Sequence, residues 1–227
     1  MNESPSADSL MTSLPSTIGV DGQAEHGWEA YYAGDLTWYT HVRNVLHHLP
    51  MLRAIGKLSP KRVLEVGAGT GSHSIFLSYF QPRVASIDLS RLLIERCVQH
   101  NRRLRGRAQF LAMDAFRLAF PDDSFDAVFS QGFFEHFSED EIALLLEEQT
   151  RVARHVVISV PNLAYGVQDF GNERLLSRHA WEELLQRLGY DLLSSSDYAP
   201  MRGRFWRGGR DMYLAVVQRL SANGAAR

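Results

Sequence analysis

The spacing of hydrophobic and polar residues changes along the chain, and these changes distinguish the expected strands from the expected helices. From Lys61 onward, short apolar runs of strand length alternate with stretches in which apolar residues recur at helical spacing. Helices are expected to begin at Ser72, Leu92, Ser138 and Ser177, and Ser90 and Ser138 are placed to cap two of them. The expected strands are RVLEVG, RVASID, AQFLAM, FDAVFSQ, HVVISVP and the ranges 190–198 and 211–220.

The alternation of strands and helices predicts an α/β fold with a doubly wound, mostly parallel seven-stranded sheet and helices on both faces. The last two strands are an exception, because only residues 199–210 separate them and this segment has no helical pattern. A parallel crossover usually needs a dozen or more residues and a helix. We therefore expect these two strands to form an antiparallel pair, with the antiparallel last strand at or near the edge of the sheet.

The region before the sheet has a helical pattern of its own. In residues 28–55, which Pro50 or Gly56 would end or kink, apolar residues fall at helical spacing: Trp38, Val42, Val45, Leu46 and Leu49. Residues 1–24 are rich in Ser, Pro, Thr and Gly, which predicts a disordered tail. The expected organisation is this tail, an N-terminal helical lid at 25–58, one domain at 59–220 and a C-terminal tail at 221–227.

Composition and charge narrow the possible classes of protein. The chain has 227 residues, of which 45% are hydrophobic, and this suits one domain with a sizeable core. The formal net charge of -2 favours neither a nucleic-acid nor a membrane partner. No apolar stretch approaches the roughly 18 to 20 residues that span a bilayer, and the N-terminus lacks a signal-peptide pattern.

The single cysteine, Cys97, excludes an intramolecular disulfide, which fits a reducing compartment. Its neighbours along the expected helix are apolar, so we interpret it as a core residue. We expect a cytoplasmic protein, and no cluster of Cys or His predicts a metal site. The sequence leaves open whether the protein is a monomer or a homodimer.

Three glycines lie between two apolar runs in VLEVGAGTGSHSIFL, residues 63–77. Because glycine costs conformational entropy, Gly67, Gly69 and Gly71 need a reason, which is either a tight turn or the close approach of a ligand. A strand, a glycine-rich turn and a helix N-terminus together are typical of a nucleotide-binding corner. The dinucleotide fingerprint G-x-G-x-x-G is incomplete, because Ser72 stands where its third glycine would be.

Four motifs in order resemble those of class I S-adenosylmethionine-dependent methyltransferases: EVGAGTG, ASIDLS, AMDA and FDAVFSQGFFEHF. The resemblance covers about residues 61–220, and SQGFFEHF is similar to the small-molecule and quinone-type branch. It implies S-adenosylmethionine as cofactor, S-adenosylhomocysteine as product, and methylation of an O or N atom of a small-molecule acceptor by in-line displacement. The alternatives are a nicotinamide-dependent oxidoreductase on a related fold and a non-catalytic S-adenosylmethionine-binding partner subunit.

The resemblance also implies a cofactor pocket. Asp88 would accept the ribose hydroxyls, Asp114 the adenine amino group, and Glu65 would orient the turn or the ammonium group. Each acid has a second interpretation: Asp88 as a helix cap, Asp114 as a turn residue and Glu65 as a structural residue. The cofactor-binding candidates are Glu65, Gly67, Ala68, Gly69, Gly71, Asp88, Leu89, Asp114, Ala115 and Gln131.

The acceptor is expected beyond the carboxyl ends of the strands. His136 in FFEHF is the candidate base, although it could instead hold its loop, and Gln131 follows the fourth strand where the methyl group should point. Aromatic residues near the N-terminus could cover the sulfonium as a lid or form a docking stripe without a ligand. Candidates for the acceptor site and the lid are Tyr31, Tyr32, Trp38, Tyr39, Phe133, Tyr165, Phe170 and Arg204.

Overall fold

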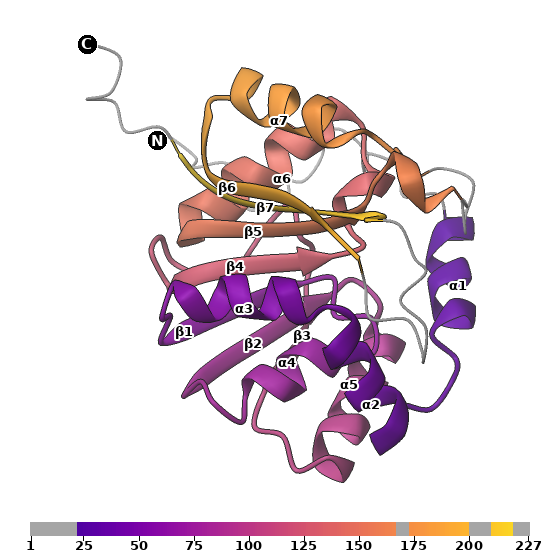
Figure 1. Ribbon diagram of the computed structural model, residues 1–227. Coiled ribbons are helices and arrows are strands. Elements are labelled where there is room, and N and C mark those ends of the chain that lie inside the picture. Colours follow the sequence, from indigo (N-terminus) through magenta and orange to yellow (C-terminus); the bar gives the residue numbers. More distant parts are fainter. Residues whose placement is uncertain (1–21, 167–172, 200–209, 220–227) are drawn as a thin grey trace, which may run out of the picture.

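The structure is a computed structural model that describes residues 22–166, 173–199 and 210–219 (Figure 1). Of the residues predicted above, Phe170, Arg204 and the predicted C-terminal tail lie outside the described residues. Residues 1–21 of the predicted N-terminal tail also lie outside them.

The seven described strands form one sheet in the order β3-β2-β1-β4-β5-β7-β6. Strands β1 to β5 pair in parallel, and β7 is antiparallel to both β5 and β6. The predicted parallel sheet and antiparallel final pair are confirmed, and β7 lies one position inside the edge. The strands are β1 (Arg62–Val66), β2 (Arg83–Asp88), β3 (Gln109–Ala112), β4 (Phe125–Gln131), β5 (Ala153–Pro161), β6 (Tyr190–Tyr198) and β7 (Met212–Arg219).

Helices cover both faces of this sheet (Figure 1). The side chains of Ser90, Ser138 and Ser177 each accept a hydrogen bond from a backbone N–H in the first turn of a helix, and Ser138 forms a capping box with Glu141. The helices after the first strand are α4 (Ser72–Leu77), α5 (Arg91–Arg103), α6 (Glu139–Val152) and α7 (Arg178–Arg187), with 3-10 turns η2 (Phe134–His136) and η3 (Leu163–Tyr165).

The helical pattern expected at 28–55 corresponds to three separate helices in the structure. They are α1 (Gly22–Tyr31), α2 (Trp38–His47) and α3 (Leu49–Lys57). Thr37 starts α2 by accepting a hydrogen bond from the Thr40 N–H. Pro50 lies in the first turn of α3, where a missing N–H costs no helical hydrogen bond. Gly56 lies within α3 and does not end it.

The two largest clusters of the core lie on opposite faces of the sheet. The first packs α6 and α7 against the strands and includes Leu146, Trp181 and Leu184. The second packs α2 and α3 against the other face through Val45 and Ile55. The central strands are therefore apolar on both sides, as is typical of parallel sheets. The strand order changes direction between β1 and β4, which is where a doubly wound sheet opens a crevice for ligands.

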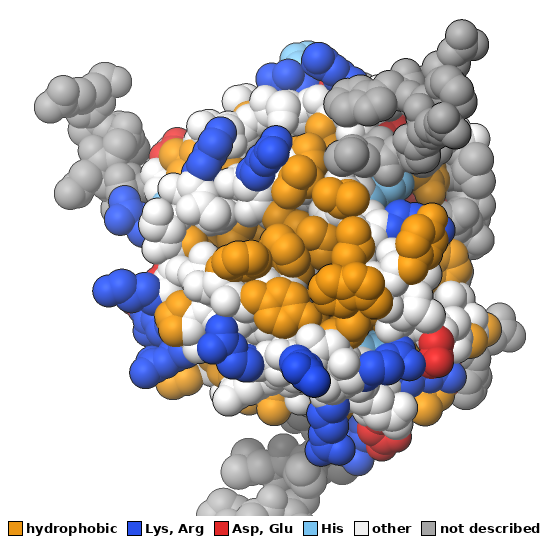
Figure 2. All heavy atoms as spheres, turned by 60° about the horizontal axis from the view of Figure 1, so that its bottom comes forward, with side chains coloured by type: hydrophobic (Ala, Val, Ile, Leu, Met, Phe, Trp, Pro, Cys, Tyr) orange, Lys and Arg blue, Asp and Glu red, His pale blue; other side chains and the backbone are white. Residues whose placement is uncertain are grey.

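Apolar side chains also gather on one outer face of the molecule, where they form a continuous patch among Lys and Arg side chains (Figure 2). Trp38 and Leu46 on α2 are 64% and 39% exposed, whereas Val45 between them is buried. The apolar residues that fall at helical spacing in this segment therefore do not all face the core. Val45 is buried, whereas Trp38 and Leu46 lie on the surface.

Candidate functional site

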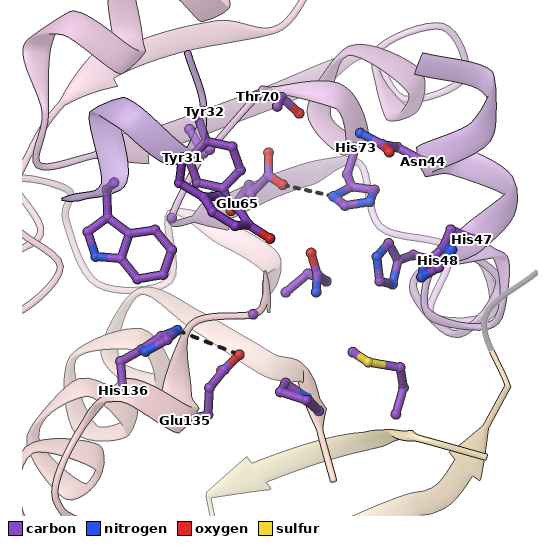
Figure 3. Close-up of a pocket in the computed structure, with 18 of the residues that line it drawn as sticks. Tyr31, Tyr32, Asn44, His47, His48, Glu65, Thr70, His73, Glu135 and His136 are labelled. Carbon is purple, nitrogen blue, oxygen red and sulfur yellow. Dashed lines mark ion pairs between the residues drawn. The ribbon is translucent and has the colours of Figure 1, made fainter. Parts of the chain in front are cut away.

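A cavity of about 610 Å³ lies at the carboxyl ends of β1 and β4, between the sheet and helices α1 and α2 (Figure 3). The loops that follow β1, β4 and β5 supply one side, and aromatic and polar residues of α1 and α2 supply the other. The lining residues are Trp28, Tyr31, Tyr32, Tyr39, Arg43, Asn44, His47, His48, Glu65, Gly67, Ala68, Gly69, Thr70, His73, Gln131, Gly132, Glu135, His136, Pro161, Tyr165, Glu173 and Met212.

The glycine turn has a backbone that only glycine adopts easily. Gly67, Gly69 and Gly71 have φ angles of +81°, +51° and +75°, in the left-handed region. A Cβ atom at Gly67 would lie 2.9 Å from the Phe133 ring, and one at Gly71 would lie 2.9 Å from Phe110. Backbone strain and close packing therefore both require these glycines. The predicted acceptor residue Phe133 lies against this turn and is not among the residues that line the cavity.

Asp88 ties the glycine turn to the start of α5. Its carboxylate accepts hydrogen bonds from the backbone N–H of Gly69 at 3.2 Å and of Ser90 at 3.1 Å. Burial raises the pKa of Asp88, and these two hydrogen bonds oppose the rise. Asp88 thus joins the glycine turn to Ser90, the residue that caps α5.

Five cofactor candidates are not among the described residues that line the cavity: Gly71, Asp88, Leu89, Asp114 and Ala115. Asp114 is exposed and accepts a hydrogen bond from the Phe116 N–H at 2.9 Å, which is the geometry of a turn residue. Leu89 is 51% exposed. The cavity therefore reaches the glycine turn at Gly67, Ala68 and Gly69, but it does not extend to the ends of β2 and β3.

Glu65 lies beneath the glycine turn and is only 1% exposed. It accepts a hydrogen bond from the Ser86 hydroxyl at 2.9 Å, and its other oxygen lies 3.5 Å from Nδ1 of His73. Nε2 of His73 is buried and has no hydrogen-bond partner among the described residues. A buried carboxylate and an imidazole nitrogen without a partner beside the turn suit the charged aminocarboxylate end of a ligand.

Helix α1 crosses the cavity and is held at several points by side chains. The Ser90 hydroxyl donates to the Glu29 carboxylate at 2.7 Å, and the Arg96 guanidinium donates to the carbonyls of Glu29 and Tyr32. At the other end, the ring of Trp28 lies edge-on to His136 at 4.7 Å. These contacts join α1 to α5 on one side and to η2 on the other.

Tyr32 fills the space directly over the glycine turn. A Cβ atom built on Gly69 would lie 3.0 Å from Cζ of Tyr32. Burial raises the pKa of Tyr32, and the charges of Tyr31 and then Asp88 raise it further, so the phenol stays neutral. The ring therefore lies against Gly69, near enough to Asp88 for that carboxylate to act on the phenol.

Glu135 is a site residue that the sequence analysis missed. It is 2% exposed, lines the cavity, and its Oε2 has no hydrogen-bond partner among the described residues. Burial raises its pKa to about 8, with a further rise from the charge of Glu173 and an opposing hydrogen bond from its own N–H. Nε2 of the predicted base His136 lies 3.8 Å from Oε1 of Glu135 (Figure 3). Because both residues lie in a 3-10 turn, no helix or strand period marks them.

A second missed group of side chains joins the connection between α2 and α3 to strands β5 and β6. Nδ1 of His48 lies 2.9 Å from the Tyr198 hydroxyl, which lies 2.8 Å from the Ser159 hydroxyl. Burial lowers the pKa of His48, and the neighbouring His73, 5.1 Å away between ring centroids, lowers it further. Figure 3 shows His47, His48 and His73 at one side of the cavity, with Glu135 and His136 at the other.

The remaining predicted residues are divided between the cavity and the surface. Trp38 lies outside the cavity, where it borders a shallow hollow with Thr37, Arg103, Leu104 and Arg105. Gly71 also does not line the cavity. The structure brings these predicted residues together around it: Tyr31, Tyr32, Tyr39, Glu65, Gly67, Ala68, Gly69, Gln131, His136 and Tyr165.

Comparison with protein families agrees with this geometry. Residues 63–155 match a family model described as a methyltransferase domain, and they span β1, the glycine turn, Asp88, Asp114 and the Glu135–His136 turn. Residues 63–155 therefore belong to a methyltransferase domain, and the sheet around them has the fold of solved S-adenosylmethionine-dependent methyltransferases.

Two curated relatives share part of this methyltransferase domain. The chain is 32% identical over 131 residues to malonyl-acyl-carrier protein O-methyltransferase of Halorhodospira halophila, covering 56% of this chain and 41% of the relative. It is 40% identical over 78 residues to demethylmenaquinone methyltransferase of Clavibacter sepedonicus, covering 34% of this chain and 31% of the relative. The chain therefore spans less than half the length of each of these relatives.

The methyltransferase fold is also shared with solved structures. Magnesium protoporphyrin IX methyltransferase from Synechocystis PCC 6803, solved with S-adenosylhomocysteine, superposes with a TM-score of 0.62 at 17% identity, covering 87% of this chain and 94% of that one. At this identity the similarity concerns the fold alone. In the part of the chain that the structure describes, every helix is too short or too polar to cross a bilayer.

Proposed function

We propose that the protein transfers a methyl group from S-adenosylmethionine to an oxygen or nitrogen atom of a small-molecule acceptor, by in-line displacement. The observation that carries this proposal is one cavity that joins the glycine turn to the buried Glu135–His136 pair. Its volume of about 610 Å³ is within the range of small-molecule pockets. A glycine turn that can hold a cofactor at one end and the His136 imidazole, which can accept a proton, at the other are what such a transfer needs.

The cofactor would lie along the glycine turn. When bound, S-adenosylmethionine supplies a methyl group that its sulfonium already activates, so the residues of the cavity have to align the acceptor and exclude water. Glu65 and His73 would hold the aminocarboxylate end, and Asp88 the ribose. Gln131 at the end of β4 would face the methyl group.

We further propose that α1 moves when the cofactor binds. Tyr32 occupies the space over Gly69 on the side of Asp88, and the Ser90–Glu29 hydrogen bond keeps α1 there. A ribose at Asp88 needs part of this space. Helix α1 would therefore act as a lid that opens for the cofactor and then covers it, with the rings of Trp28 and Tyr31 facing the reacting groups.

In this proposal His136 accepts the proton that the acceptor loses. Its ring is held edge-on by Trp28, and its neighbour Glu135 has a pKa of about 8, near the range in which proton transfer is effective at neutral pH. His136→Gln should lower kcat while leaving the affinity for S-adenosylhomocysteine unchanged. An equal loss of affinity would instead assign His136 to the structure of the pocket.

The experiment that tests the function is titration calorimetry with S-adenosylhomocysteine, with NADH as the control. Binding of S-adenosylhomocysteine alone supports the proposal, and binding of NADH alone contradicts it in favour of an oxidoreductase. Methyl transfer is then followed from labelled S-adenosylmethionine to a panel of phenols, carboxylic acids and amines. Cofactor binding without transfer to any acceptor, including protein acceptors, would favour a non-catalytic partner subunit.

A further inference from the structure

The exposed face of α2 carries an apolar stripe that the site does not use. Trp38, Val42 and Leu46 recur every four residues, so they lie on one side of the helix. Trp38 is 64% exposed and Leu46 is 39% exposed. Large side chains this exposed in a row are unusual on a monomeric surface, where apolar residues are normally scattered.

Aromatic residues at the end of α4 extend this stripe. The ring of Phe76 lies 5.2 Å from Phe80 and 6.5 Å from Tyr79, and Phe80 is 71% exposed. His41 connects the two groups, because its ring lies 6.3 Å from Tyr79 and 5.8 Å from Trp38. We call the surface formed by these residues the aromatic face: Trp38, Val42, Leu46, Phe76, Tyr79 and Phe80.

Charge is distributed unevenly around the aromatic face. The chain as a whole has 24 Lys and Arg residues and 26 Asp and Glu residues. Three segments form this side of the molecule, 36–62, 72–85 and 99–110, and they contain no Asp or Glu at all. They contain ten basic residues: Arg43, Arg53, Lys57, Lys61, Arg62, Arg83, Arg102, Arg103, Arg105 and Arg107.

Several of these basic groups lie directly beside the aromatic face. The Arg107 guanidinium donates to the carbonyls of Ser78 and Tyr79, and Arg103 and Arg105 border the same hollow as Trp38. Arg103 and Arg62 form ion pairs with Asp35 and Asp126, acids from outside the three segments. Figure 2 shows the result, with apolar side chains at the centre of the face and Lys and Arg side chains around its margin.

We propose that the aromatic face and its basic margin dock on the surface of an anionic lipid bilayer. Exposed aromatic and aliphatic side chains enter the boundary between headgroups and acyl chains, while Lys and Arg attract the anionic headgroups. Nucleic acid fits less well, because Val42 and Leu46 offer no ring on which a base could stack. The net charge of -2 did not indicate a membrane partner, because it sums the basic residues on this side of the molecule with the acidic residues of the rest of the chain.

Docking on this face would bring the cavity close to the bilayer. Helix α2 carries the aromatic face on one side, and on another side its residues Tyr39, Arg43 and His47 line the cavity. An acceptor that is dissolved in or attached to the membrane would then reach the site over a short path. The docking itself does not depend on which acceptor is methylated.

The test is co-sedimentation of the full chain with vesicles of phosphatidylcholine, with and without phosphatidylglycerol. We expect binding only to vesicles that contain phosphatidylglycerol, weakened by high salt because screening reduces the attraction between exposed charges. The double variant Leu46→Ser and Phe80→Ser should bind about tenfold more weakly because it loses apolar insertion. Arg83→Glu combined with Arg105→Glu should abolish the preference for phosphatidylglycerol.

The matched control is Leu144→Ser, which changes a similarly exposed leucine, 46% exposed, on α6. It should bind vesicles like the unchanged protein, and all variants should keep the same thermal midpoint. Equal binding to both vesicle types, or no effect of the double variant, would overturn the proposal. So would a dimer in light scattering that the double variant dissociates, or binding of the face to single-stranded RNA in place of vesicles.

Discussion

The two walls of the cavity are built in different ways. The sheet wall consists of Glu65, the glycine turn, Gln131 and Glu135, and it follows strands paired over long registers in a core that is apolar on both sides. The helical wall consists of α1 and α2, and α1 is held by a few side-chain contacts such as Ser90 to Glu29. The sheet wall is fixed by the fold itself, whereas α1 in the helical wall is held by contacts that a ligand can replace.

This difference assigns different roles to the two walls. A cofactor needs precise hydrogen-bond partners, which a rigid sheet supplies best. Access to an enclosed cavity needs a part that moves, and segments with few buried contacts open at the lowest free-energy cost. The following predictions test the contrast between a rigid sheet wall and a movable helical wall.

The first prediction, which has the largest expected effect, compares the loss of stability caused by substituting two glycines, one from each wall. Gly71→Ala should destabilise the protein by roughly 2–4 kcal/mol, because its φ is +75° and the new Cβ would lie 2.9 Å from Phe110. Gly34→Ala, between α1 and α2, should change stability by less than about 0.5 kcal/mol, because no described atom lies within 4 Å. Urea unfolding measures both, and similar losses would remove the contrast.

The second prediction concerns the cofactor. Asp88→Ala should weaken binding of S-adenosylhomocysteine by about 100-fold, because the carboxylate holds the turn through Gly69 and is the expected ribose partner. Calorimetry measures the affinity, and circular dichroism checks that the variant folds. Asp140→Ala, an exposed acid on α6, serves as the control. Unchanged affinity in Asp88→Ala would remove the ribose assignment.

The third prediction uses pH to test the buried carboxyl of the sheet wall. The folded protein keeps the proton of Glu135 up to about pH 8, whereas a glutamic acid in the unfolded chain loses it near pH 4.5. Stability contributed by this proton is therefore complete below pH 4.5 and is lost as pH rises to about 8, by at most about 1.4 kcal/mol per pH unit. Glu135→Gln lacks this dependence.

The thermal midpoint of the unchanged protein, relative to that of Glu135→Gln, should therefore fall from pH 5 to pH 8. Buried His41 and His48 act in the opposite direction, because their lowered pKa values cost stability as pH falls below 6.5. Both proteins contain these histidines, so their contributions cancel in the difference. A difference that stays constant with pH would mean that Glu135 is ionised in the folded protein.

The smallest expected effect compares two helix caps. Ser90→Ala and Ser138→Ala each remove an N-cap and should each cost about 1 kcal/mol of stability. Only Ser90 also donates to Glu29 on α1, so only Ser90→Ala should loosen the helical wall. We expect stopped-flow measurements to show several-fold faster association of S-adenosylhomocysteine with Ser90→Ala. Equal rates in both variants would show that this contact does not hold α1.

The same contrast explains how much of the molecule the sequence predicted. The strands, the antiparallel final pair and the serine caps followed from hydrophobic period and local hydrogen-bond chemistry, and the structure confirms them. Three positive φ angles at Gly67, Gly69 and Gly71 agree with the need for glycine at the turn. These features depend on residues close together in the chain or on a repeating pattern.

The helical wall could not be predicted in the same way. The break between α1 and α2 depends on how Tyr32 and Glu29 reach partners about 60 residues later in the chain, beyond any local pattern. The stripe with Trp38 has the spacing of a buried helix face, but Trp38 is 64% and Leu46 39% exposed in the structure. Glu135 was hidden because its burial depends on the packing of a short 3-10 turn and not on its neighbours in sequence.

The place of β7 in the sheet also constrains how the chain is made. Among the described strands, β6 pairs only with β7, and β7 fills the position between β6 and β5. During synthesis, β5 and β6 therefore leave the ribosome with open edges and wait for residues 212–219 to join them. The Tyr198 hydroxyl likewise connects β6 to His48, one of the first described segments to be translated. A nascent chain interrupted before β7 would expose one open edge of β5 and leave β6 without a partner strand, which is a form that aggregates and that cellular quality control removes.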